Sequence, residues 1–136
     1  MNNPIKSLKI KVENLKKNYG SIRALKGISL EVQTGEVLVI IGPSGCGKST
    51  FLRCMNLLEE PTEGILQIGN HTINFADKKT IPTGKNIARF RSQFGMVFQQ
   101  FDLFSHKTAI ENIIIGLTVV KKISYDDAKN IAINLL

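Results

Sequence analysis

The sequence predicts an α/β domain in which antiparallel strands lead into a buried strand, a glycine-rich loop and a helix. The segments Leu8–Glu13 and Ile28–Gln33 alternate apolar and polar residues, which is the period of a half-buried strand. A turn at Thr34–Gly35 then leads into Glu36–Ile41, which is almost wholly apolar and rich in β-branched residues. A strand covered on both faces has this composition, so we expect this segment to be the central strand.

A helix is predicted directly after the glycine-rich loop, where apolar residues recur at helical spacing. Pro61 is expected to close it, because proline cannot continue a helix. Cys54 lies on the same helix and is expected in the core. The face expected to pack against the domain consists of Phe51, Leu52, Met55 and Leu58.

The middle of the chain predicts a β-hairpin, a loop, a short helix and a further strand. The hairpin covers Gly64–Phe75 and turns at Gly69–Asn70, because a glycine-containing turn separates two apolar runs. The polar segment Asp77–Gly84 is expected to be a loop and Lys85–Gln93 a short helix. Phe94–Gln99 is a short apolar run, which is typical of a strand.

The last third of the chain predicts two helices. Thr108 and Glu111 have the spacing of a capping box, as do Ser124 and Asp127. The second helix has an apolar stripe that still runs at Leu136 without a stop signal, so we expect the domain to be interrupted there. The stripe consists of Ala128, Ile131, Ala132 and Leu135.

Composition excludes several classes of protein. With 136 residues, 43% apolar and 21% charged, the chain has room for one domain with one core and is not disordered. The longest apolar run, Val37–Ile41, is too short to cross a bilayer, and the N-terminus lacks the apolar region of a signal peptide. We therefore expect a cytosolic protein. The net charge is +7, but the basic residues form pairs and no long run, so nucleic-acid binding is not expected.

Cysteines and histidines do not predict a structural metal or a disulfide framework. Cys46 and Cys54 are too few for either. His71 and His106 lie far from them and from each other, without metal-ligand spacing. Both histidines are interpreted as loop residues.

The segment GPSGCGKST, residues 42–50, satisfies the pattern G-x-x-x-x-G-K-[ST] between a predicted strand and a predicted helix. Glycines let the backbone N–H groups converge on a phosphate, and the helix N-terminus adds its dipole. Lys48 is expected to reach the β- and γ-phosphates and Ser49 to ligate Mg²⁺. The alternative is a glycine-rich turn with an exposed lysine. The predicted phosphate-contacting residues are Gly42, Pro43, Ser44, Gly45, Cys46, Gly47, Lys48, Ser49 and Thr50.

Cys46 lies inside this loop, beside a helix N-terminus and a lysine, a setting that makes a thiol reactive. Alkylation there would block the phosphate site. The alternative is that Cys46 is merely a small residue that fits the loop.

Two stretches, Glu13–Gly64 and Phe94–Ile113, closely resemble ATP-binding subunits of ABC transporters, in the branch that takes up polar amino acids. The likeness covers nearly the whole chain. It implies an incomplete P-loop NTPase core of the ABC ATPase type. Residues 1–99 would form the nucleotide-binding core with its β subdomain, and residues 100–136 the start of the helical subdomain.

The resemblance also implies roles for single residues. Tyr19 matches the aromatic residue that stacks on adenine, although a strand-end tyrosine in the core is an alternative. Gln99 matches the glutamine that approaches Mg²⁺ and the attacking water, so Lys48 and Gln99 are the expected catalytic residues. The segment after Gln99 would meet a permease subunit, or its apolar residues could fold inward as loop anchors. Those residues are Phe101, Leu103 and Phe104.

Three family motifs are missing from the sequence: the LSGGQ-type signature, the Walker B strand with its acidic pair, and the switch histidine. Leu57–Glu60 does not replace the acidic strand, because its apolar part is too short and lies on a helix. We therefore expect the 136-residue chain alone to hydrolyse ATP negligibly. Without the acidic strand beside it, Val37–Ile41 is expected to expose a flat apolar edge.

The expected function is therefore that of an ATP-binding subunit of an ABC importer, binding Mg-ATP at the glycine-rich loop to power uptake of polar amino acids. Expected partners are transmembrane permease subunits, a second ATP-binding subunit arranged head-to-tail, and indirectly a substrate-binding protein. The expected location is the cytoplasmic side of the cell membrane, as a peripheral subunit. The alternative is a truncated, stand-alone nucleotide-binding or regulatory module without transport activity. An unrelated P-loop kinase or GTPase is disfavoured by the lead-in and by the Gln99 region.

Overall fold

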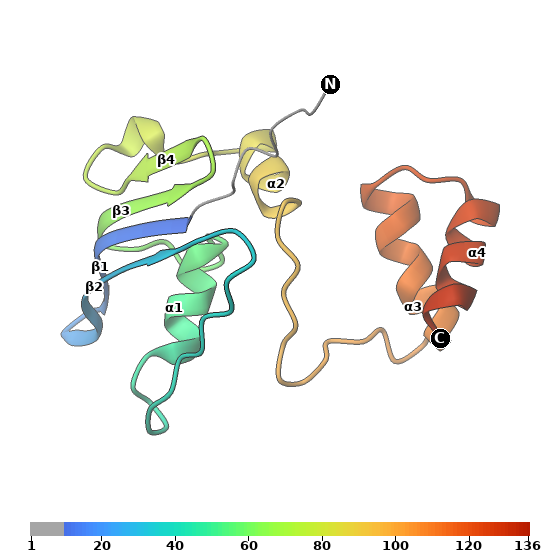
Figure 1. Cartoon of the computed structure of the whole chain (residues 1–136), viewed down its shortest axis with the longest axis horizontal. Coiled ribbons are helices and arrows are strands. Elements are labelled where there is room, and N and C mark those ends of the chain that lie inside the picture. Colours follow the sequence, from blue (N-terminus) through green and yellow to red (C-terminus); the bar gives the residue numbers. More distant parts are fainter. Residues whose placement is uncertain (1–9) are drawn as a thin grey trace. The chain divides into compact units, whose positions relative to one another are not determined.

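The computed structural model describes residues 10–136 and divides the chain into two compact units, Met1–Phe94 and Gly95–Leu136. The predicted strand residues Leu8 and Lys9 lie outside the described part. The first unit contains a sheet and two helices, and the second contains two helices joined by a turn (Figure 1).

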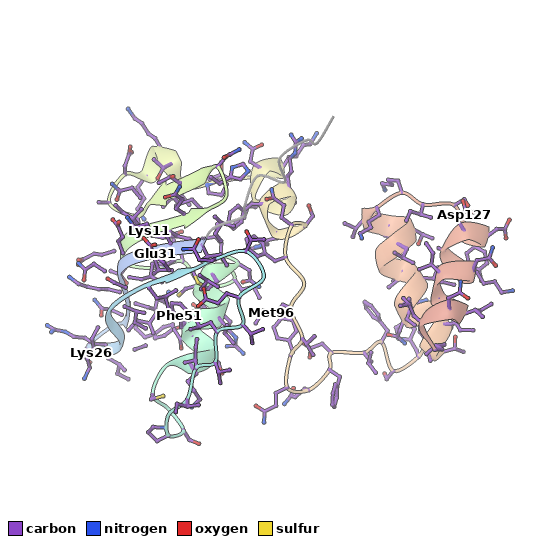
Figure 2. The ribbon with its side chains drawn as sticks, in the orientation of Figure 1. Lys11, Lys26, Glu31, Phe51, Met96 and Asp127 are labelled. Atoms are coloured by element: carbon purple, nitrogen blue, oxygen red, sulfur yellow. The ribbon has the colours of Figure 1, made fainter. Side chains whose placement is uncertain are left out.

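The first unit is built on a four-stranded antiparallel sheet with the order β2-β1-β3-β4. The predicted early strands and the hairpin are confirmed, although β1 and β2 are longer than predicted. Register shifts between Val12 and Asn18 interrupt the alternation along β1, which is why the pattern ended early. In an undisturbed stretch Lys11 faces Glu31 (Figure 2), with 3.8 Å between Nζ and Oε1. The strands are β1 (Ile10–Tyr19), β2 (Ile22–Val32), β3 (Glu63–Ile68) and β4 (His71–Asn74).

Helix α1 (Lys48–Met55) packs on this sheet and closes the core. Phe51 and Cys54 are its buried residues, and Figure 2 labels Phe51. The prediction for Cys54 is confirmed, whereas the predicted face was wrong in part: Leu52 is 51% exposed and Leu58 is exposed. The other buried residues of this core come from all four strands, from α2 and from the segments just after α1 and β4. They are Val12, Leu15, Leu25, Leu57, Leu66, Ile68, Ile73, Phe75 and Phe90.

Helix α1 ends before Pro61, which the sequence had suggested as its stop. Leu57 has a left-handed φ of 59°, which continues no α-helix. Arg91, the last residue of α2 (Lys85–Arg91), donates from its guanidinium to the carbonyl oxygens of Leu57 at 2.6 Å and Asn56 at 3.4 Å. These bonds satisfy carbonyl groups that a helix end leaves without partners.

The two apolar runs predicted as further strands are not strands. Val37–Ile41 forms no ladder with any described residue, and Val37 and Ile41 are 86% and 87% exposed. Phe94–Gln99 likewise carries no strand structure. A strand needs a hydrogen-bonded neighbour, and the described residues provide none for either run. The prediction of a buried central strand over Glu36–Ile41 is therefore wrong. The side chains of Val37–Ile41 are exposed, but without a strand they do not form the expected flat strand edge. The predicted loop Asp77–Gly84 contains one 3-10 turn, η1 (Lys78–Thr80).

The second unit contains helix α3 (Ala109–Ile115), which runs into a π-helical turn, η2 (Gly116–Val120), and helix α4 (Tyr125–Leu135). The capping box at Thr108 and Glu111 is confirmed in both directions. Ser124 caps α4 by accepting from the backbone N–H of Asp127. Of the predicted stripe, the two alanines are buried with Ile114, whereas Ile131 and Leu135 are exposed.

None of the helices within residues 10–136 combines the length and the apolar character that crossing a membrane requires.

Candidate nucleotide-binding site

The glycine-rich loop leads directly into α1 and is seated against β2 through Gly47. This residue is the N-cap of α1, with a left-handed φ of 96°. A Cβ atom at Gly47 would lie 2.6 Å from the carbonyl oxygen of Ala24 and 3.1 Å from Leu25. Only glycine fits both the backbone conformation and the close approach, so the loop enters the helix at a fixed position on the sheet.

The N-terminus of α1 has the character of an anion site. No side chain caps it, and its first turn holds no acidic residue. The first N–H groups of a helix have no partner within the helix, and its dipole places partial positive charge there. Ser49 and Thr50 belong to this first turn. A phosphate is the kind of group that such a terminus binds.

Lys48 folds back over the loop. Its Nζ atom donates to the carbonyl oxygens of Gly42 and Pro43, each at 2.8 Å, and lies 3.6 Å from the sulfur of Cys46. The ammonium is thus held by uncharged carbonyl groups beside the expected phosphate site, which we call the phosphate cradle and which consists of residues 42–50. A phosphate is a stronger acceptor than a carbonyl group, so an anion in the cradle would draw the ammonium away from these partners.

Residues for Mg²⁺ are sparse around this loop. Within residues 10–136 no group of three or more His, Cys, Asp or Glu residues is placed to hold a metal ion. The exposed Ser49 hydroxyl in the first turn of α1 is an oxygen donor of the type that Mg²⁺ accepts alongside phosphate oxygens. The donor set therefore fits a metal that arrives with its phosphates.

Tyr19 ends β1 and is 42% exposed, so it is not a core tyrosine. Burial raises the pKa of its phenol, and Glu59 raises it further, while a hydrogen bond with Thr50 and the charge of Lys17 oppose the rise. Lys17 lies over the ring, with 4.7 Å from Nζ to the ring centroid. Tyr19 therefore neighbours α1 and the segment that follows it.

Gln99 belongs to the second unit and is exposed in a turn. Phe101, Leu103 and Phe104 are exposed as well, so they do not fold inward as loop anchors. The predicted roles of Gln99 and of these residues stay predictions.

The cysteines are both free, Cys46 exposed and Cys54 buried. Burial raises the pKa of the Cys54 thiol to about 11, so this thiol is inert at neutral pH. The reactivity of Cys46 stays a prediction. His106 lies in a turn, as predicted, whereas His71 lies in β4, where its ring meets Phe90 edge-on at 6.3 Å.

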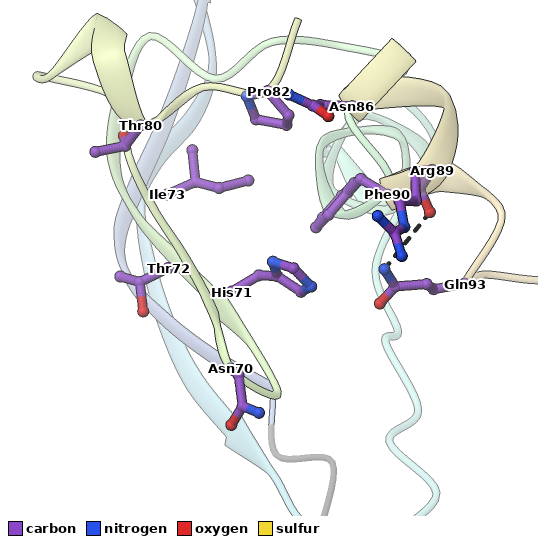
Figure 3. Close-up of a pocket in the computed structure, with 10 residues that line it drawn as sticks. All are labelled: Asn70, His71, Thr72, Ile73, Thr80, Pro82, Asn86, Arg89, Phe90 and Gln93. Atoms are coloured by element: carbon purple, nitrogen blue, oxygen red, sulfur yellow. Dashed lines mark hydrogen bonds between the residues drawn. The ribbon is translucent and has the colours of Figure 1, made fainter.

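A hollow of about 660 Å³ lies between β4 and α2, apart from the glycine-rich loop (Figure 3). Figure 3 shows His71 and Phe90 on opposite sides of it, and Gln93 donates to the carbonyl oxygen of Arg89 at 3.5 Å. Among the described residues, no lysine lines it. Sequence reasoning missed it because three separate segments form it. The lining residues are Asn70, His71, Thr72, Ile73, Thr80, Pro82, Asn86, Arg89, Phe90 and Gln93.

Sequence reasoning also missed the contacts of Lys17. Its Nζ atom lies 3.3 Å from the Glu59 carboxylate and donates to the carbonyl oxygen of Glu60 at 2.8 Å. A lysine pair on a strand and a glutamate after a helix carry no signal by themselves, because the contact joins residues far apart in the sequence.

Comparisons with known proteins agree on one family. The family model for ABC transporters matches residues 25–135. L-cystine import ATP-binding protein TcyN of Bacillus subtilis is 50% identical over 127 residues, which are 93% of this chain and 48% of that protein. Glutamine transport ATP-binding protein GlnQ of Bacillus subtilis is 46% identical, over 90% of this chain and 48% of that protein. Histidine/lysine/arginine/ornithine transport ATP-binding protein HisP of Escherichia coli is 42% identical, over 94% and 51%.

Solved structures show the same fold. A dimeric post-hydrolysis state of the ATP-binding cassette MJ0796, bound to ADP and Pi, superposes with a TM-score of 0.76 at 34% identity. The match covers 92% of this chain and 54% of that chain. The predicted fold class, an incomplete ABC ATPase core, is therefore confirmed. The chain spans about half the length of the curated relatives it matches.

Proposed function

Because this chain belongs to the ABC transporter family, we propose that it supplies the nucleotide-binding part of an ATP-binding subunit of an importer. The observation that carries the proposal is the glycine-rich loop, with its uncapped helix N-terminus and the Lys48 ammonium beside it. This arrangement is suited to a polyphosphate. The proposed cargo class is polar amino acids, since the similar proteins are named for cystine, glutamine and basic amino acids.

In the proposed binding mode the triphosphate of ATP accepts from backbone N–H groups of residues 42–50 other than Pro43, which has no N–H. Lys48 leaves the Gly42 and Pro43 carbonyls for the β- and γ-phosphates. Ser49 would hold Mg²⁺ together with phosphate oxygens, and Mg²⁺, when bound, neutralises phosphate charge. Tyr19 would stack on the adenine through its exposed ring. Gln99 would orient the attacking water and relay nucleotide state to the permease.

The proposed partners follow from the family and from the second unit. The exposed apolar side chains of Phe101, Leu103 and Phe104 would meet a transmembrane permease subunit. A second ATP-binding subunit would pair head-to-tail, and the similar solved cassettes are dimeric. A substrate-binding protein would act through the permease. The proposed location is the cytoplasmic face of the cell membrane, on the permease.

The 136 residues by themselves are proposed to hydrolyse ATP at a negligible rate. Their sequence contains no LSGGQ-type signature, no acidic Walker B pair and no histidine after residue 106. Positioned groups of this kind are each worth powers of ten in rate. A steady-state assay that found turnover abolished by Lys48→Ala would contradict this.

A second candidate function is a nucleotide-binding module without transport activity. It is favoured by one observation: the glycine-rich loop, Lys48 and Tyr19 all lie in the first unit, which has its own core. The first experiment serves both candidates. Mg-ATP and Mg-ADP are titrated into the purified chain, and we expect saturable binding that Lys48→Ala removes. Absence of saturable binding would contradict the cradle as proposed.

The transport role needs a separate measurement. We expect this chain's sequence, within the complete subunit of a relative, to restore ATP-dependent uptake of a polar amino acid into permease-containing vesicles. Nucleotide binding without restored uptake would favour the module.

A further inference from the structure

We propose that Lys17 is a positioning residue, which holds the Tyr19 ring as the platform for the nucleotide base; the inference rests on the proposed nucleotide-binding function. The Lys17 side chain is only 14% exposed, although lysine normally stays in water. Its burial is matched by three contacts of one ammonium group. The contacts are with the Tyr19 ring, the Glu59 carboxylate and the Glu60 carbonyl oxygen.

The first contact is with the aromatic ring. The Nζ atom lies 4.7 Å from the Tyr19 centroid, within the range of cation–π attraction. The cation takes one face of the ring. A flat base can therefore stack only on the opposite face, so Lys17 defines the side on which a nucleotide binds.

The other two contacts fasten the ammonium to the segment after α1. They are the Glu59 carboxylate at 3.3 Å and the Glu60 carbonyl oxygen at 2.8 Å. The adjoining backbone is tied to the same segment, because the N–H of Asn18 donates to Thr62 Oγ1 at 3.0 Å and the N–H of Thr62 donates to the Lys16 carbonyl at 2.8 Å. The end of β1 is thus fixed to the segment after α1, and that segment is bonded to α1 because the N–H of Glu59 donates to the Arg53 carbonyl oxygen at 3.1 Å.

Helix α1 carries the phosphate cradle at its other end. Lys17 therefore links the proposed base platform to the helix that holds the proposed phosphate site. ATP binds both features at once, whereas a bare polyphosphate binds only the cradle. This difference separates a positioning role from a general contribution to folding.

The neighbouring lysine provides a matched control. Lys16 pairs with Glu63 at 2.7 Å and is one residue away on the same strand. A further advantage is that the chain has two tyrosines and no tryptophan. Tyr125 is exposed on α4, so a Tyr125→Phe background leaves Tyr19 as the sole tyrosine in a chain without tryptophan.

The experiment measures binding of Mg-ATP and of Mg-tripolyphosphate in this background, by quenching of Tyr19 fluorescence and by calorimetry. We expect Lys17→Met to weaken ATP binding about three- to tenfold and to leave tripolyphosphate binding unchanged. Lys17→Arg should restore ATP binding, and Lys16→Met should alter neither ligand. In a Tyr19→Ala chain, Lys17→Met should cause no further loss of affinity for Mg-ATP.

Equal losses for both ligands, or undiminished ATP binding, would overturn the positioning role. If the unsubstituted chain binds neither ligand, the proposed function fails, and the phenol titration of Tyr19 decides the contact alone. Loss of the nearby positive charge should raise the pKa of Tyr19 in Lys17→Met but not in Lys16→Met. An unchanged titration would then overturn the inference.

Discussion

The segments on either side of Ile41 contrast in a way that the sequence conceals. Residues 37–41 carry the strongest strand pattern in the chain, yet they form no strand and stay exposed. The glycine-rich loop and α1, which follow at once, are seated on a sheet whose own patterns are weaker. The difference lies in where the partners come from. The sheet and α1 find their partners within residues 10–94, whereas the apolar run has no hydrogen-bonded strand beside it among the described residues.

The largest expected effect on stability comes from a substitution at Phe51, in the core between α1 and the sheet. Phe51→Ala removes a buried ring between α1 and the sheet and should lower the free energy of unfolding by about 3–5 kcal/mol. Chemical denaturation monitored by circular dichroism measures it. Leu52→Ala, on the exposed side of the same helix, should cost less than about 1 kcal/mol. Equal losses would mean that α1 does not pack as described.

A smaller effect is expected from the glycine that seats the loop. Gly47→Ala combines a left-handed φ with a Cβ 2.6 Å from the Ala24 carbonyl, so we expect a loss of about 2 kcal/mol or more in stability, together with weaker Mg-ATP binding. Gly45→Ala is the matched control, because its φ is also left-handed, at +80°, but nothing lies within 4 Å of the added atom. It should cost about 1 kcal/mol. A milder effect at Gly47 than at Gly45 would refute the close approach.

The exposed apolar run Val37–Ile41 is tested by introducing charged side chains. Val37→Lys with Ile41→Lys replaces two almost fully exposed side chains, so the stability of the first unit should change by less than about 0.5 kcal/mol. Self-association should fall, because exposed apolar runs promote pairing between chains. Sedimentation velocity measures the second effect. A large loss of stability would show that the run is packed after all.

The smallest effect concerns the second unit, whose helix α3 begins with a capping box. Its hydrogen bonds with Thr108 hold the pKa of Glu111 below the ordinary value of 4.5. The depressed pKa means that the carboxylate stabilises α3 above pH 4.5 and that this contribution disappears as the pH falls through the folded-state pKa. We expect helicity to decrease over that range, by circular dichroism, and Glu111→Gln to flatten the decrease. An acid transition unchanged in Glu111→Gln would refute this.

Local signals predicted local structure well. The capping box at Thr108, the Ser124 cap, the hairpin and the glycine-rich loop each depend on residues a few positions apart, and all appear in the structure. At Ser124 only the bond from the Asp127 N–H to the serine side chain is formed. Non-local features were missed or misplaced. The β-bulges near Asn14 hid half of β1, and the face of α1 was assigned before its partners were known. The predicted site residues outside the loop, Tyr19 and Gln99, came from resemblance, since neither has a local pattern of its own.

The two hydrogen bonds from Arg91 to the end of α1 have a mechanical consequence. Arg91 lies only a few residues before the boundary at Phe94 and Gly95, where the chain passes into its second unit. A force applied at that junction is therefore transmitted to the C-terminal end of α1 through the two Arg91 hydrogen bonds, and not only along the backbone. Helix α1, which follows the glycine-rich loop, is thus held at its C-terminal end by the segment that leads into the second unit.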